Sequence, residues 1–290
     1  MQLSDLIIQH EKGKTYNKAC IVAGMPNSEY HAHAGISNSG LTKIDISPAH
    51  YRYAEPKDPT RAMEIGTAIH AAILEPERFK KEYMLMPEIK SRAASEYKKA
   101  ASALGSEFVL VGKEVSNVLG MQDAILSNKF LKSRLSENGY TELSVFAFDP
   151  ETGVFCKCRF DYISESLKAV DLKKTQDARQ DAFSKSIFNY RYYVQDVFYR
   201  DVFEWCTGVE LQSFEFLAVE ESKPHGCMLH ALPETAQMIG REEYRKNLND
   251  YYECFTNDHW PAYECTETVE TDLPYWAYSR YDNDIIQEIK

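Results

Sequence analysis

Apolar residues recur at helical spacing over much of the first half of the chain. Asp58-Pro-Thr-Arg is typical of a helix start and predicts a helix that runs to about Phe79. Its apolar face would consist of Met63, Ala68, Ile69, Ala72 and Ile73. Residues 92–137 predict further helix, with apolar side chains on one side and charged ones on the other. Upstream, residues 1–58 predict loops and short helices, one of them capped by Ser47 ahead of a proline.

The hydrophobic period changes to two in the middle of the chain. Leu143–Asp149 and Val154–Ile163 are strand-like, and a turn rich in Pro, Thr and Gly joins them, which predicts a hairpin. Leu167–Lys173 predicts a third short strand. The later elements predicted are a helix over about Ala178–Cys206 closed by Gly208, strands over Leu211–Val219 and Gly226–Leu232, and a helix over 233–256.

This order of elements predicts an α/β fold, a central mixed β-sheet flanked by helices. Gly and Pro are scattered, so no linker divides the chain and residues 1–290 are expected to form one domain. Its expected parts are N-terminal helices and loops (1–58), a core (59–232), and a helix followed by an acidic and aromatic tail (233–290).

Composition indicates a globular protein of the reducing cytoplasm. The chain has 290 residues, 44% of them hydrophobic and 27% charged, which suits a packed core and excludes disorder. Its seven cysteines include no CxxC pair, so free thiols are expected rather than a disulfide framework. No basic segment precedes an apolar stretch at the N-terminus and no apolar run reaches 18 residues, so neither a signal peptide nor a membrane span is expected.

The net charge of −11 counts against a nucleic-acid partner, but the charge is uneven. Residues 241–290 carry a net charge of −7, which leaves −4 for the first 240 residues. The window Arg78–Lys99 holds seven basic and three acidic residues. Because a protein that encloses DNA needs a basic channel rather than a basic exterior, DNA remains open as a partner.

Two aspartates and a lysine are the leading candidates for chemistry. Asp161 and Asp171 are expected at the ends of neighbouring strands, where two carboxylates and a backbone carbonyl make a hard oxygen site for Mg²⁺. Lys173 lies two residues beyond Asp171 and shares its face in a strand, where it could orient an attacking water or neutralise phosphate charge. Taken alone, an aspartate and a lysine two residues apart also occur in many proteins as solvated residues at strand ends.

Four further residues could complete this site. Glu142 could add a third carboxylate or be a solvated edge charge, and His70 could be a metal ligand or an ordinary helix residue. Gln195 and Tyr199 are four residues apart on one helix face. They could orient Lys173 and bind a DNA phosphate, or simply pack against the sheet.

Basic and hydroxyl side chains supply two candidate phosphate-binding groups. A pocket for a 5′-phosphate could consist of Ser37, Ser39, Arg52 and Arg61. A DNA channel could be lined by Lys90, Arg92, Lys98 and Lys99. The alternatives are helix caps and surface charges for the first group, and a solvated face for the second.

The ordered set of motifs resembles a known class of enzymes. Gly66-Thr-x-x-His70, Glu142, Arg159-x-Asp161, Asp171-Leu-Lys173 and Gln195-x-x-x-Tyr199 resemble the RecB-like branch of the PD-(D/E)XK nucleases. Upstream, G-I-S-x-S-G-L, S-P-A-H-Y-R-Y and P-T-R-A-M-E-I-G-T-A-I-H-A-A-I-L-E-P-E resemble RecE-type exonucleases (exonuclease VIII), and this likeness spans about residues 20–220. The strict Pro-Asp spelling is absent, because Ala169-Val170 precedes Asp171.

The resemblance assigns roles to the candidate residues. It implies that the metal ligands are His70, Asp161, Asp171 and the Leu172 carbonyl. It further implies that Lys173 is the catalytic lysine, that Glu142 assists the metal or the water, and that Gln195 and Tyr199 support the site and the DNA. The DNA contacts expected are Arg52, Arg61, Lys90 and Arg92.

The same resemblance implies an activity and partners. It implies a Mg²⁺-dependent 5′-to-3′ exonuclease on double-stranded DNA, with two ions in each site and Mn²⁺ as a substitute. The product would carry 3′ single-stranded overhangs for recombination by strand annealing. The expected partners are DNA ends, three further copies of the chain in a ring, and a single-strand annealing protein, in a bacterial or phage-encoded setting.

Two other functions fit the same core. One is a structure- or site-specific endonuclease, which would also cut circular DNA. The other is an inactive DNA-binding scaffold for recombination, against which the presence of every expected catalytic residue argues.

Overall fold

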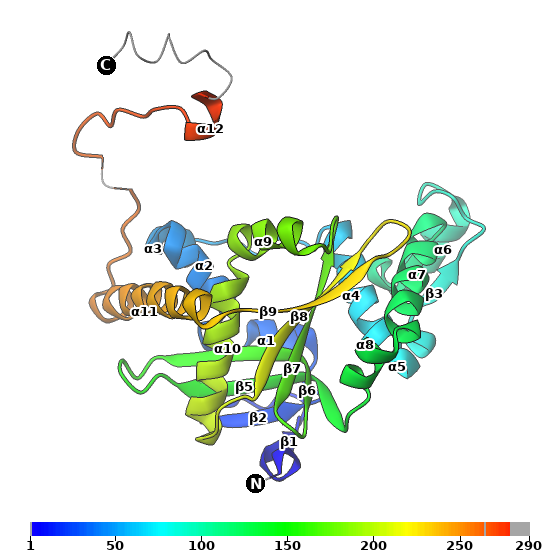
Figure 1. Ribbon diagram of the computed structural model, residues 1–290, viewed down its shortest axis with the longest axis horizontal. Helices are drawn as coiled ribbons and strands as arrows, with labels where there is room; N and C mark the ends of the chain where they lie inside the picture. Colours follow the sequence, from blue (N-terminus) through cyan, green and yellow to red (C-terminus); the bar gives the residue numbers. More distant parts are fainter. Residues whose placement is uncertain (1, 264, 279–290) are drawn as a thin grey trace.

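The computed structural model describes residues 2–263 and 265–278, and a seven-stranded mixed sheet lies at its centre (Figure 1). The strand order is β1-β2-β5-β6-β7-β8-β9. The strands are β1 (Ile7–Gln9), β2 (Cys20–Ala23), β5 (Gly139–Phe148), β6 (Phe155–Ser164), β7 (Lys168–Thr175), β8 (Ser213–Glu220) and β9 (Cys227–Ala231). β1 with β2 and β7 with β8 are parallel pairs, and the others are antiparallel. The predicted fold class, a mixed sheet flanked by helices, is confirmed.

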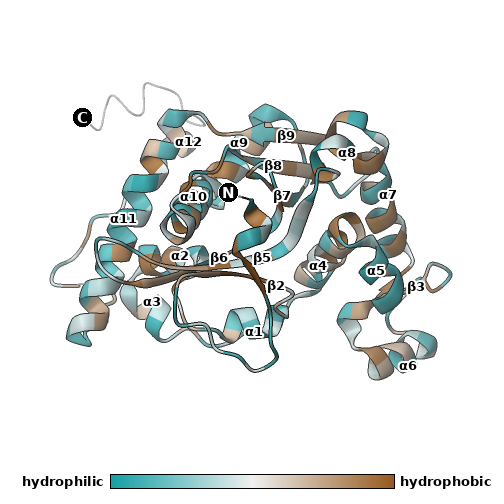
Figure 2. Ribbon diagram, turned by 90° about the horizontal axis from the view of Figure 1, so that it is seen from below, coloured by the Kyte–Doolittle hydropathy of each residue, from teal (hydrophilic) through white to brown (hydrophobic). Residues whose placement is uncertain are grey.

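Helices cover both faces of the sheet (Figure 2). One face packs against α2 (Asn38–Ile46), α10 (Tyr192–Thr207) and α11 (Glu234–Asn257), and the other against α4 (Arg61–Leu74), α7 (Lys113–Ser127) and α8 (Lys129–Leu135). The remaining elements are η1 (Leu3–Leu6), α1 (Asn27–Ala32), α3 (Pro48–Arg52), α5 (Pro76–Glu82), α6 (Ser95–Leu104), η2 (Ser106–Phe108), α9 (Gln180–Asn189) and α12 (Tyr275–Tyr278), and the parallel pair β3 (Met84–Met86) and β4 (Val109–Val111). Two buried clusters therefore sandwich the sheet.

Several predicted elements are confirmed by their local chemistry. The hairpin of β5 and β6 is present, with Leu143 opposite Phe160. Ser47 caps α3 by accepting a hydrogen bond from the His50 amide, and a proline follows it. Gly208 ends α10 with a φ of 74°, the left-handed conformation that glycine adopts without penalty.

The prediction of a single helix over 178–206 is wrong, because the helix is interrupted at Arg191. This residue has a φ of 54°, which ends the run of α9 and starts α10 in a new direction. Its buried guanidinium lies 3.0 Å from Glu243 and 3.3 Å from Asp45. These tertiary ion pairs hold a backbone conformation that helical periodicity does not reveal.

Three other boundaries differ from expectation. The helix predicted to run to Phe79 ends at Leu74, and α5 begins separately at a proline. Within residues 92–137 the run Val109–Val111 forms a strand, as β-branched residues favour. Residues 1–58 also contain β1 and β2, which extend the sheet edge but are too short to show an alternating pattern.

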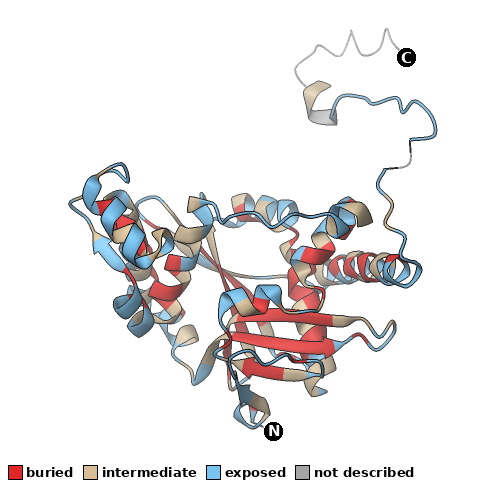
Figure 3. Ribbon diagram, turned by 180° about the vertical axis from the view of Figure 1, so that it is seen from behind, coloured by how far each residue is buried: buried red, intermediate tan, exposed pale blue. Residues whose placement is uncertain are grey.

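The C-terminal segment leaves the folded body after α11 (Figures 1 and 3). From residue 261 onward its described residues are mostly exposed, and α12 is the one regular element among them. Residue 264 and residues 279–290 of the expected tail lie outside the described residues. Among the described helices, none has the length and apolar character needed to cross a membrane.

Gly240 marks a close approach of α11 to α10 and carries a stability prediction. A Cβ atom at this position would clash with the Tyr193 carbonyl oxygen and lie 2.8 Å from its carbonyl carbon. We expect Gly240→Ala to push the two helices apart and to destabilise the fold by about 1–3 kcal/mol, a drop of several degrees in melting temperature. Gly66→Ala, where no atom lies within 4 Å, is the matched helical control and should leave the melting temperature equal or higher. Equal melting curves for both variants would contradict this packing.

Candidate active site

The candidate site lies where β6 and β7 separate. Their pairing is confined to Tyr162 with Val170 and Ile163 with Ala169, although the same register would place Asp161 opposite Asp171. Instead, the Asp161 carboxylate accepts a hydrogen bond of 2.8 Å from the Leu172 amide. Both aspartates thus lie within strands, not at strand ends as predicted, and the opening between the strands is what makes room for them.

A histidine from α4 meets two carboxylates at this opening. His70 Nδ1 lies 3.6 Å from Asp161 Oδ2 and 3.9 Å from Glu142 Oε1. His70 Nε2 lies 3.2 Å from the Leu172 carbonyl oxygen. Candidate ligand atoms of His70, Glu142 and Asp161 all lie within 4.8 Å of one another. The chain therefore brings together residues that are far apart in its sequence.

Glu142 reaches this cluster through an unusual backbone conformation. It lies across from Asp161, between the ladder pairs Thr141–Tyr162 and Leu143–Phe160, but its φ is 49°. A non-glycine residue in this region is uncommon and costs of order 1 kcal/mol or more, so the surrounding sheet must impose it. Such conformations concentrate at functional sites.

The cluster has the chemistry and the size for a divalent cation. In an octahedral Mg²⁺ site with ligands at about 2.1 Å, opposite ligand atoms are about 4.2 Å apart, so atoms within 4.8 Å of one another can close around one ion. Two carboxylates and a carbonyl oxygen suit Mg²⁺ or Mn²⁺, and imidazole is compatible with the latter. These residues therefore fit the implied metal.

The electrostatics of the cluster also favour a cation. Burial raises the pKa of Asp161 to about 7, although His70 opposes this shift. Burial alone would lower the pKa of His70, but the charges of Asp161 and Glu142 outweigh it and raise the pKa to about 9. Acidic groups held in a partly buried site need a compensating positive charge, which a bound divalent ion supplies.

Lys173 is held in a closed set of contacts beside the cluster. Its Nζ lies 2.6 Å from Asp171 Oδ2 and donates a 3.0 Å hydrogen bond to Gln195 Oε1. Gln195 Nε2 donates in turn to Asp171 Oδ1 over 2.6 Å. The same Nζ lies 4.4 Å from the ring centroid of Tyr192. Burial opposes the charged form, but Asp171 outweighs it and raises the pKa of Lys173, so the lysine stays protonated.

Asp171 and Tyr199 are placed differently from the other candidates. Both carboxylate oxygens of Asp171 are engaged by Lys173 and Gln195, so Glu142, rather than Asp171, is the second carboxylate near His70. The Tyr199 ring packs against Phe160 and Phe214 in the core. In the described part of the chain its hydroxyl makes no hydrogen bond to Gln195 or Lys173.

Arg159 ties the N-terminal region to the site, a link that sequence reasoning missed. Its guanidinium lies 3.8 Å from Glu142 Oε2 and donates to the Met25 carbonyl over 3.0 Å. It also donates to Ser144 Oγ and lies 4.2 Å from the ring centroid of Tyr30. The place of Arg159 in the Arg159-x-Asp161 motif was the available signal, whereas nothing in the sequence pointed to Met25 or Tyr30.

Arg61 is not free to bind DNA as expected. All five of its N–H groups donate within the protein, to the carboxylates of Glu64 and Glu114 and to the carbonyl oxygens of Ser106 and Val109. Arginine in such a network stabilises the contact of α4 with α7 and has no donor left for a phosphate. The expectation of a DNA contact at Arg61 is therefore wrong.

The other expected phosphate ligands lie outside the cluster. Arg52 is exposed on α3, 5.9 Å from the Trp260 ring centroid. Ser37 caps α2 and hydrogen-bonds to Ser39, which agrees with the capping alternative. The remaining basic side chains are exposed on α6 and the segment before it: Lys90, Arg92, Lys98 and Lys99. Their contact with DNA stays a prediction.

Comparisons with known proteins agree with this architecture. The model of the PDDEXK-like domain of unknown function (DUF3799) matches residues 37–271, most of the chain. A crystal structure of a "Putative exonuclease" from Eubacterium rectale is similar in fold, with a TM-score of 0.58 at 12% identity over 88% of this chain and 99% of that one. A structure of SSO0001 matches at a TM-score of 0.26 and 13% identity, over 73% of this chain and 85% of that one, too weakly to support an argument. No curated protein sequence matches significantly.

Proposed function

The chain belongs to the PDDEXK-like family and is a nuclease of the PD-(D/E)XK class, and we propose that it is a metal-dependent 5′-to-3′ exonuclease on double-stranded DNA. The observation that carries the proposal is the meeting of His70, Glu142 and Asp161 around the Leu172 carbonyl, with Lys173 beside them. The overall similarity to the Eubacterium rectale protein supports the choice of an exonuclease.

The acidic cluster would hold the metal. His70, Glu142, Asp161 and the Leu172 carbonyl are the ligands that the geometry offers to Mg²⁺. When bound, the ion supplies Lewis acidity toward the scissile phosphate and its attacking water. Burial opposes the charged form of Glu142, but His70 and, to a smaller extent, Arg159 at 3.8 Å outweigh it and lower the pKa of this carboxyl.

Lys173 supplies a fixed positive charge at the site. Its ammonium is oriented by Asp171 and Gln195 before any substrate arrives, so it needs no rearrangement when phosphate charge develops. Three N–H donors on one nitrogen allow it to keep these contacts and still donate to a water or a phosphate oxygen. Gln195 therefore acts through Lys173, as a positioning residue.

The exonuclease proposal is tested with two DNA forms of one sequence. A linear duplex with 5′-phosphates and a covalently closed circle are incubated with the protein and Mg²⁺. We expect the linear duplex to be shortened from its 5′ ends, leaving 3′ single strands, while the circle stays intact. Cutting of the circle would replace the proposal with an endonuclease, and survival of both forms would contradict nuclease activity on duplex DNA.

A further inference from the structure

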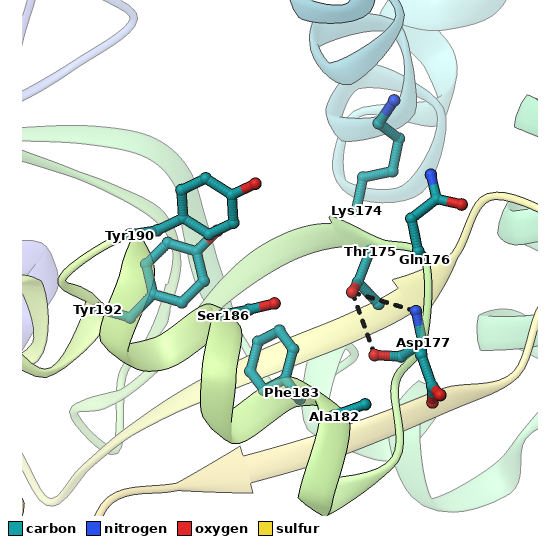
Figure 4. A pocket seen from close by; sticks show the side chains of 9 residues that line it. All are labelled: Lys174, Thr175, Gln176, Asp177, Ala182, Phe183, Ser186, Tyr190 and Tyr192. Carbon is teal, nitrogen blue, oxygen red and sulfur yellow. Dashed lines mark hydrogen bonds between the residues drawn. The ribbon is translucent and has the colours of Figure 1, made fainter. Parts of the chain in front are cut away.

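A pocket outside the metal cluster opens between the end of β7 and α9 (Figure 4). Its volume of about 430 Å³ lies within the range typical of small-molecule sites. It is lined by Lys174, Thr175, Gln176, Asp177, Ala182, Phe183, Ser186, Tyr190 and Tyr192. None of these residues is a ligand of the cluster, so the pocket has no role in the chemistry described so far.

The pocket shares a wall with the catalytic lysine. Tyr192 lines the pocket, and the centroid of its ring lies 4.4 Å from Lys173 Nζ. Lys174, the next residue on β7, lines the pocket as well. A group bound here would therefore contact Tyr192, which also contacts the catalytic lysine.

Two tyrosine rings give the pocket a stacking surface. Tyr190 and Tyr192 are stacked, with centroids 5.6 Å apart and an interplanar angle of 27°, and Figure 4 shows both rings at one side of the pocket. Tyr190 is 66% exposed, so much of its ring surface is accessible to a bound group. Exposed aromatic rings beside a nuclease site are the surfaces on which unpaired bases stack.

The polar groups of the pocket favour a neutral heterocycle over a phosphate. The charge of Lys174 is paired with Glu221 at 3.1 Å, and the Asp177 carboxylate in the wall is paired with Arg179 at 2.6 Å, so the charged groups of the lining are already matched within the protein. Ser186 and the Gln176 amide offer donors and acceptors of the kind that a base edge uses. We infer that the pocket is a subsite for one unpaired DNA base next to the scissile phosphate, an inference that rests on the proposed function.

The test measures binding without cleavage. A duplex with a short frayed 5′ end carries 2-aminopurine as its terminal unpaired base, and its twin carries an abasic site there. Both are titrated with protein in EDTA, with anisotropy reporting affinity and 2-aminopurine fluorescence reporting stacking. For the wild-type protein we expect the fluorescence to be quenched and the abasic DNA to bind about 10-fold more weakly, the size of one base–aromatic stack.

Variants on α9 and directly after it decide whether Tyr190 is responsible for the quenching and for the preference for DNA that carries the terminal base. Tyr190→Ala should abolish the quenching and bind the two DNAs equally, whereas Tyr190→Phe, which keeps the ring, should behave as wild type. Phe188→Ala is the matched control, because Phe188 is 71% exposed on α9, stacks on Tyr193 and does not line the pocket. It should retain the full preference for the base.

An equal preference for the base in wild type and Tyr190→Ala would overturn the inference. So would an equal loss in Phe188→Ala, since it would point to a general effect on this part of the fold. Because cleavage is not measured, a wild-type protein that failed to digest DNA would contradict the proposed function and leave this readout intact.

Discussion

Lys173→Ala should lower the rate of DNA cleavage by about 100- to 1,000-fold, the usual cost of removing one fixed electrostatic donor from an active site. The ammonium is the one cationic group that the structure holds against both Asp171 and Gln195 in the described residues. Gel digestion of a labelled linear duplex with Mg²⁺ measures the effect. DNA affinity, measured in EDTA, should change far less than the rate.

The fold of this variant needs its own control, because the change leaves the buried Asp171 carboxylate without a cation. Lys173→Arg keeps that charge and should retain the wild-type circular dichroism spectrum. Its planar guanidinium cannot reproduce the compact ammonium, so it should also cleave slowly. Lys168→Ala changes a lysine on the same strand that pairs with Glu137, and it should digest DNA normally. A Lys173→Arg protein with the wild-type rate would show that the site is assigned wrongly.

Asp161→Asn should remove both metal binding and cleavage. The substitution keeps an oxygen that can accept the Leu172 amide hydrogen bond, so the opening between β6 and β7 should persist. It removes the negative charge that faces His70 at 3.6 Å. We expect at least a 100-fold loss of activity, since even outer partners of metal ligands are worth about 10- to 100-fold.

Metal binding can be measured without activity. Mg²⁺ or Mn²⁺ should raise the melting temperature of the wild-type protein, because a ligand that binds the folded state stabilises it. The rise should be absent in Asp161→Asn and present in Asp123→Asn, which removes an exposed carboxylate on α7. A metal-dependent rise of equal size in Asp161→Asn would exclude this aspartate as a ligand.

The sequence predicted the parts of the fold whose signals are local. The alternation of β6 and the turn after β5 predicted the hairpin, and Ser47 and Gly208 predicted helix ends. The break at Arg191 depends on ion pairs with residues far away in the chain, which no local pattern encodes. β1 and β2 escaped notice because three or four residues are too few for a period to be visible.

The sequence predicted which residues form the candidate site better than it predicted how they are arranged. His70, Asp161 and Leu172 meet as the motif resemblance implied. The left-handed backbone of Glu142, which brings it into the cluster, depends on the sheet around it and leaves no trace in the sequence. Gln195 contacts Lys173, which was one of the roles expected for it, but its second hydrogen bond, to Asp171, could not be foreseen, because it depends on where α10 packs after the break at Arg191.

The ring of four subunits and the annealing partner stay predictions of the resemblance. We propose that duplex DNA approaches the protein at the basic side chains of α6 and of the segment before it. An acidic chain can bind DNA if its basic residues are gathered in this way, since affinity depends on local phosphate contacts. Binding that weakens steeply with salt, and less steeply after substitution of Lys90 and Arg92, would identify this surface.

The central claim is that the cluster of His70, Glu142 and Asp161, together with Lys173, is the active centre of a metal-dependent nuclease. The most direct test is the release of nucleotides from a linear duplex by the wild-type protein and by Lys173→Arg, each with Mg²⁺ and with EDTA. We predict that the wild-type protein releases nucleotides with Mg²⁺. Almost none should be released by the wild-type protein in EDTA or by Lys173→Arg under either condition. Release by the wild-type protein in EDTA, or equal release by Lys173→Arg with Mg²⁺, would contradict the claim.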